Sequence, residues 1–121
     1  MKYEEFAREV AERANIDEGE AERTAIVVLQ ELCDRLSGKE ARDLLAQLPA
    51  RLKTAVIVSP SPLPISADEF VDRVAAELQV PREEAIGRIR AVFATLRRAV
   101  SWGELEDVLR ELDPEYANFL A

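Results

Sequence analysis

The sequence contains no histidine and only one cysteine, four glycines and six prolines in 121 residues. Without histidine the chain lacks the commonest general base, the Ser–His and Cys–His pairs of hydrolases, and the Glu-x-x-His ligands of di-iron bundles. A single cysteine cannot form a disulfide within the chain, and no glycine-rich phosphate loop is present. These absences argue against an enzyme, and we expect no catalytic residue, no cofactor and no metal site.

Positive charge is also scarce, because 16 Lys and Arg residues stand against 24 Asp and Glu residues, a formal net charge of −8. Nucleic acids and anionic membrane surfaces bind through excess basic residues, so neither is an expected partner. Apolar runs stay well below the roughly 18 to 20 residues that span a bilayer. The first residues also lack the basic and apolar regions of a secretory signal, and we therefore expect a cytoplasmic protein.

What the sequence does contain is helical periodicity. Apolar residues recur at steps of three and four over residues 20–36, which places them on one face of a long helix. Similar patterns predict a helix over 3–14 before it and another over 37–48 after it. Ser37 and Glu40 have the spacing of a capping box, in which each side chain satisfies a free amide, so we expect the long helix to stop at Leu36.

The same pattern returns 64 residues later. Without a gap at this offset, the two halves share 13 identical pairs, mostly at core and cap positions, where chance would produce only a few. The pairs include Phe6/Phe70, Val10/Val74, Ala21/Ala85, Leu32/Leu96, Ser37/Ser101, Glu40/Glu104, Asp43/Asp107 and Leu48/Leu112. The chain therefore reads as an internal duplication.

These patterns predict an all-α fold built from two pseudo-symmetric helical repeats, 3–57 and 67–121. Each repeat has three helices and a short terminal helix, and we expect the repeats to pack through their central helices into one domain of bundle type. Between them, residues 58–66 carry prolines on alternate positions, which remove amide donors and favour an extended path. We interpret this segment as a linker.

Two runs of the first half carry a family resemblance. They are Tyr3-Glu4-Glu5-Phe6 through Ala21-Glu22-Arg23, and Arg35-Leu36-Ser37-Gly38-Lys39-Glu40-Ala41-Arg42-Asp43-Leu44-Leu45-Ala46-Gln47-Leu48-Pro49, echoed at 70–74 and 101–112. With these runs the chain resembles, over nearly its whole length, the bacterial family called domain of unknown function 2267. The resemblance implies an all-helical, internally duplicated cytoplasmic protein of prokaryotic type and brings no activity with it. Trp102 and Asp113 depart from the family pattern, which more often has Gly and Pro there.

The two halves differ in chemistry along one edge of their central helices. Ile26 and Cys33 of the first copy correspond to Arg90 and Arg97 of the second, and Arg98 lies one step further round the helix. In an acidic protein this makes a local basic strip. We interpret it as a candidate contact for an acidic partner segment or an anionic ligand.

These candidate contacts have structural alternatives. The arginines can pair with the protein's own acids, such as Glu104 or Glu106 on the following helix, and we favour this pairing. Trp102 can anchor a partner or cover the intramolecular core, and we favour the cover. Small residues on the back of the second central helix fit either a close helix contact or an exposed alanine-rich face. These residues are Gly87, Ala91 and Ala94.

Most other polar chemistry has a structural interpretation. The many carboxylates fall near expected helix starts and on outward faces, where capping and solvation explain them. Cys33 lies at the margin of an apolar face, which favours a buried and inert thiol. We therefore interpret the chain as a non-enzymatic interaction or regulatory module that binds another protein, with self-association left open. The alternative is small-ligand binding in an apolar pocket between the repeats, which a lined cavity of a few hundred Å³ would favour.

Overall fold

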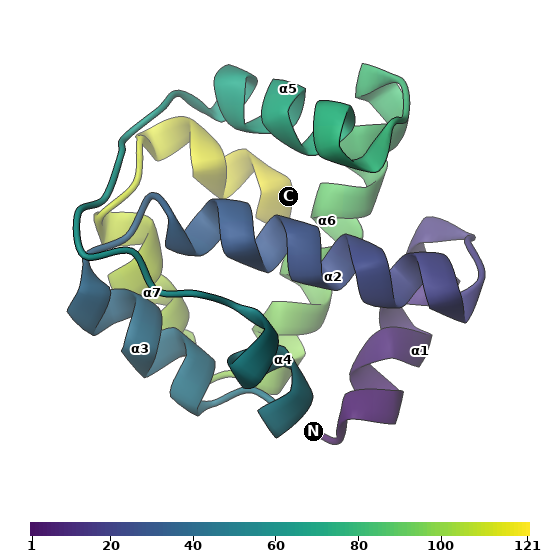
Figure 1. Cartoon of the computed structure of the whole chain (residues 1–121), viewed down its shortest axis with the longest axis horizontal. Helices are drawn as coiled ribbons and strands as arrows, with labels where there is room; N and C mark the ends of the chain where they lie inside the picture. Colours follow the sequence, from purple (N-terminus) through teal and green to yellow (C-terminus); the bar gives the residue numbers. More distant parts are fainter.

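The structure, a computed structural model, describes all 121 residues and contains eight helices and no strand (Figure 1). The helices are α1 (Tyr3–Ala14), α2 (Glu18–Cys33), α3 (Gly38–Ala46), α4 (Ala50–Ala55), α5 (Ala67–Leu78), α6 (Arg82–Ala99), α7 (Trp102–Arg110) and the 3₁₀ helix η1 (Pro114–Leu120). The all-α fold class expected from the apolar periodicity is confirmed. None of these helices combines the length and hydropathy needed to cross a bilayer.

Most helix ends follow from local chemistry. The Asp17 side chain accepts a hydrogen bond from the Glu20 amide at 2.8 Å and starts α2, as the sequence predicts. The expected end of this helix at Leu36 is wrong, because α2 ends at Cys33. The amides of Arg35 and Leu36 bond to carbonyls only three residues back, so the chain tightens there into a turn. Leu36 nevertheless remains fully buried.

The helices of each half pack against helices of the other half. In Figure 1, α2 crosses in front of α6, and α3 lies beside α7. Helix α1 packs against both α2 and α6, while α5 packs against both α6 and α2. The contact surfaces join in one core of 32 buried hydrophobic residues that draws on every helix. Each half therefore buries much of its apolar surface against the other half.

The second half carries an aromatic cluster inside this core. The Phe70 ring centroid lies 5.3 Å from that of Tyr116 and 5.8 Å from that of Phe119, and Phe93 lies 5.3 Å from Phe119. The Tyr116 hydroxyl donates to the Ile65 carbonyl at 2.9 Å, which ties η1 to the chain segment before α5. The cluster thus joins α5, α6 and η1.

Helix α6 is covered on several sides by α1, α2, α5 and η1. On its small-residue face, Ala91 is buried, whereas Gly87 is exposed and a β-carbon there would meet no atom within 4 Å. Neither of the two alternatives for this face holds along its whole length. Ala91 is buried, Ala94 is partly exposed and Gly87 is exposed, so the cover decreases from Ala91 toward Gly87.

The proline-rich segment between α4 and α5 runs along the outside of the fold (Figure 1). It is anchored at two places near α2. The Gln30 side chain exchanges two hydrogen bonds of 2.9 Å with the backbone of Ile57, and the Leu63 amide donates to the Asp34 carbonyl at 2.9 Å. The segment therefore follows the end of α2 rather than standing free of the core.

Replacing the capping serines is expected to reveal a difference between the halves. Both side chains cap a helix at 3.2 Å, but the Ser37 hydroxyl also donates to Glu111 Oε2 at 2.8 Å. We expect Ser101→Ala to cost about 1 kcal/mol of unfolding free energy and Ser37→Ala to cost more, about 1.5 to 2 kcal/mol. Urea unfolding of the two variants measures this, and equal losses would contradict it.

Candidate functional site

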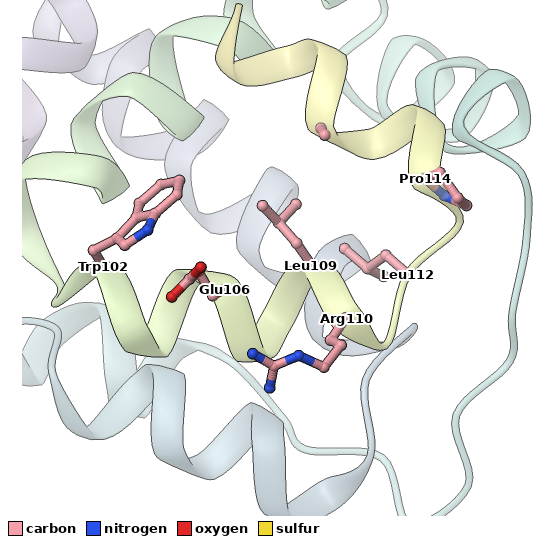
Figure 2. A pocket seen from close by; sticks show the side chains of 7 residues that line it. Trp102, Glu106, Leu109, Arg110, Leu112 and Pro114 are labelled. Carbon is pink, nitrogen blue, oxygen red and sulfur yellow. The ribbon is translucent and has the colours of Figure 1, made fainter.

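A groove lies on the outer side of α7, where Trp102 stands at the first helical position (Figure 2). Its volume is about 480 Å³. We call it the Trp102 groove, and it is lined by Trp102, Glu106, Leu109, Arg110, Leu112, Pro114 and Ala117. Trp102, Glu106 and Leu109 project from the same side of α7, as their spacing along the helix requires.

Trp102 does not cover the core, which corrects our preferred interpretation of this residue. Its side chain is 52% exposed, and Leu105 and Val108 occupy the buried face of α7 instead. The first position of α7 points the indole outward, where the Arg97 guanidinium lies 5.6 Å from the ring centroid. The tryptophan is therefore available on the surface.

The basic strip is divided in the structure. Arg98 pairs with Glu9 of α1, so it is neutralised, but by a residue other than the expected acids of the following helix. Arg97 makes no ion pair and touches Trp102, while Arg90 makes no ion pair and lines a separate hollow of about 350 Å³. Of the four candidate contact residues, only Arg97 and Trp102 come together.

That separate hollow is the one to which both halves contribute. Arg13 of α1 faces Arg90, Ala91 and other residues of α6, together with the end of the chain. Its volume of a few hundred Å³ is the size expected for a small-ligand pocket between the repeats, but Arg13 and Arg90 make its lining less apolar than expected. Ligand binding between the halves stays a prediction.

A related groove occurs in the first half, between α3 and α4. Its volume is about 410 Å³, and its lining includes Arg42, Leu45, Ala46 and Lys53. These positions lie 64 residues before Glu106, Leu109, Arg110 and Ala117 of the Trp102 groove. Gly38 occupies the position that corresponds to Trp102. The first-half groove therefore offers a natural control without the indole.

A second candidate site lies where α3 and α7 meet. Carboxylate oxygens of Glu40, Asp43 and Glu104 lie within 4.8 Å of one another, and we call these residues the carboxylate cluster. Glu40 is 8% exposed and Glu104 is 9% exposed. Oε1 of Glu40 and Oε2 of Glu104 have no hydrogen-bond partner while both groups are ionised. Two of the acids assigned to caps and outward faces are thus buried against each other.

Long-range contacts explain this arrangement. In a capping box Glu40 would accept from the Ser37 amide, but that amide donates to Glu111 Oε1 at 2.8 Å. The Ser101 amide likewise donates to Gln47 Oε1 at 2.8 Å. Each half therefore completes a cap of the other half, and the two capping-box glutamates turn into the interface.

Burial, a hydrogen bond with Glu40 and the negative charges of Glu40, Asp43 and Asp107 raise the pKa of Glu104 to about 8. A proton on Glu104 lets the two buried carboxyl groups share a hydrogen bond at neutral pH. The outer aspartates are already paired, because Lys39 Nζ lies 2.8 Å from Asp43 and Arg110 Nη1 lies 2.6 Å from Asp107. No basic side chain reaches the buried pair itself.

The sequence interpretation missed the carboxylate cluster. Its signal was the repetition of Glu and Asp at the same positions in both halves, Glu40/Glu104 and Asp43/Asp107. From the sequence alone, these identities indicate only repeated helix caps. The hydrogen bonds of Glu111 and Gln47 show that the amides to be capped are bound by the opposite half. Only the meeting of α3 with α7 turns them into a cluster.

Other buried polar groups belong to the packing of α2. Arg88 of α6 donates to Glu20 at 2.9 Å and to Thr24 at 3.0 Å, which fixes the crossing of α2 and α6. Burial and a hydrogen bond with Glu77 raise the pKa of Glu31 to about 7, and Glu31 pairs with Arg35 at 3.4 Å. Cys33 is fully buried, as expected, and burial raises the pKa of its thiol to about 12.

Comparison with known proteins agrees with the resemblance seen in the sequence. The family model described as an uncharacterized conserved protein, DUF2267, matches residues 3–119. No curated protein matches the chain. The match covers nearly all of the 121 residues, including both candidate sites. The chain therefore belongs to the uncharacterised family DUF2267.

Proposed function

We propose that the protein is a non-enzymatic interaction module that binds another protein through the Trp102 groove. The single observation that carries this proposal is the exposed indole of Trp102 at the rim of an apolar hollow. Tryptophan supplies more binding energy at protein interfaces than most residues.

The lining suggests the chemistry of the partner. Leu109, Leu112 and Pro114 supply an apolar floor beside the indole. Arg97 reaches the rim and has no carboxylate partner, in a chain whose net charge is −8. A partner segment that places an apolar side chain in the hollow and an acidic side chain beside Arg97 would complement both features.

We also propose that the two halves are pseudo-symmetric repeats in one domain. The first residues of α1, α2 and α3 recur 64 residues later as those of α5, α6 and α7. The contacts of Ser37 with Glu111 and of Ser101 with Gln47 join positions related by the same offset. In this proposal the second repeat has specialised for binding by acquiring Trp102, where the first repeat has Gly38.

Photo-crosslinking from the two related grooves tests the binding proposal. A photo-reactive amino acid in place of Glu106 lies in the Trp102 groove, and one in place of Arg42 lies at the corresponding exposed position of the first half. In the native host we expect a discrete adduct with another protein from position 106 and none from position 42. Mass spectrometry of the adduct then identifies the partner.

Trp102→Ala should remove the adduct from position 106 because it removes the interface anchor. Leu63→Ala is the matched control, since Leu63 is 57% exposed and lies outside the groove. Adducts of equal yield from positions 42 and 106, or one that survives Trp102→Ala, would contradict the proposal. An adduct with a second copy of this chain would replace it with self-association.

A further inference from the structure

The carboxylate cluster between α3 and α7 is not used by the Trp102 groove and needs its own explanation. Two glutamates that are more than nine-tenths buried face each other, and each has an oxygen without a hydrogen-bond partner in the ionised state. Burying an ionised carboxylate is costly unless a proton, a basic side chain or a cation compensates it. Lys39 is held by Asp43 and Arg110 by Asp107, so the compensation comes from a shared proton or from a cation.

The spacing of the oxygens fits a metal ion. All three ligand oxygens lie within 4.8 Å of one another. Two oxygens bound to one Ca²⁺ can lie at most about 5.2 Å apart, since each Ca–O bond is about 2.3 to 2.6 Å, so this upper limit is compatible with one ion between them. Ca²⁺ tolerates irregular coordination, whereas Mg²⁺ demands a near-ideal octahedron, so three side chains from two helices suit Ca²⁺ better.

We propose that Glu40, Asp43 and Glu104 form a binding site for a hard divalent cation of the size of Ca²⁺, held between α3 and α7. The ligands come from both halves, so the cation bridges them. Glu40 and Glu104 supply buried oxygens, and Asp43 supplies one from the solvent side, where water can complete the coordination shell.

Titration of the chelator-treated full chain with CaCl₂ tests the site, by calorimetry and by thermal unfolding. At pH 8 we expect one saturable site and, at about 100 times its Kd, a rise in Tm of roughly 5 to 15 °C.

Glu104→Gln should weaken Ca²⁺ binding at least tenfold, while the chain stays folded because the amide can donate to Glu40. Asp43→Asn is a second ligand variant on the other helix, with the same expected loss of affinity. Glu12→Gln is the matched control, since Glu12 is exposed on α1 far from the cluster. Trp102→Ala should bind Ca²⁺ normally, so the site can stand even if the Trp102 groove proves inert.

Three results would overturn the proposal. They are the absence of saturable Ca²⁺ binding at pH 8, an affinity in Glu104→Gln equal to that of the unaltered chain, and tighter binding of Mg²⁺ than of Ca²⁺. In the first two cases the shared proton alone accounts for the buried pair.

Discussion

Cutting the chain between Pro60 and Ser61 is expected to give two halves that fold only together. Isolated chains of about 60 residues bury only about 60% of their unfolded surface and are marginal without further support. Here the loss is greater, because α1 would lose α6, α2 would lose α5 and α3 would lose α7. Fragments 1–60 and 61–121 should each be largely unfolded alone.

Circular dichroism and NMR spectra of the separate and mixed fragments measure this effect. Mixing should restore the helical signal and a single cooperative transition, since the exchanged contacts do not depend on the link at Ser61. The intact chain, measured under the same conditions, is the control. Two fragments that each melt sharply and independently would show that the halves are separate domains.

Phe70→Ala is expected to cause a large loss of stability. Phe70 is fully buried and contacts the rings of Tyr116 and Phe119, so its removal opens a cavity between α5 and η1. The expected cost is about 3 to 5 kcal/mol of unfolding free energy. A domain of this size has only about 5 to 15 kcal/mol in total.

Urea unfolding with a common m-value measures this loss. Trp102→Ala is the control, because it also removes a large aromatic ring but from a side chain that is 52% exposed. Its effect should stay within about 0.5 kcal/mol. A loss below about 1 kcal/mol for Phe70→Ala would mean that the aromatic cluster is not closely packed.

Helix positions were largely readable from the sequence. Periodicity over 3–14 and the side chains of Asp17, Ser37 and Ser101 act within three or four residues of their targets, so the sequence alone contains both partners. The end of α2 was misplaced because a tight turn after Cys33 keeps Leu36 buried and so continues the apolar pattern beyond the helix.

The family was also readable, since its model matches the runs that carried the resemblance. Burial of Cys33 followed from its place beside an apolar face. The family match and the burial of Cys33 could be predicted because each depends on a pattern that is continuous along the chain.

The candidate sites needed the tertiary structure. Whether Trp102 covers the core or faces solvent depends on the orientation of α7 against α3, and the partner of Arg98 is Glu9, 89 residues away. The spacing of residues along the chain predicts neither the orientation of one helix against another nor a contact between residues so far apart in the sequence.

In the carboxylate cluster, the contribution of the sequence can be separated from that of the tertiary structure. The sequence alone determined that Glu40 and Glu104 would stand at the third position of a capped helix. The tertiary structure decided what their side chains do. Glu111 and Gln47 of the opposite half accept hydrogen bonds from the amides of Ser37 and Ser101, and these amides would otherwise donate to Glu40 and Glu104. Local hydrogen bonds follow from neighbours in the chain, whereas the competition for a shared donor is settled only when distant segments pack together.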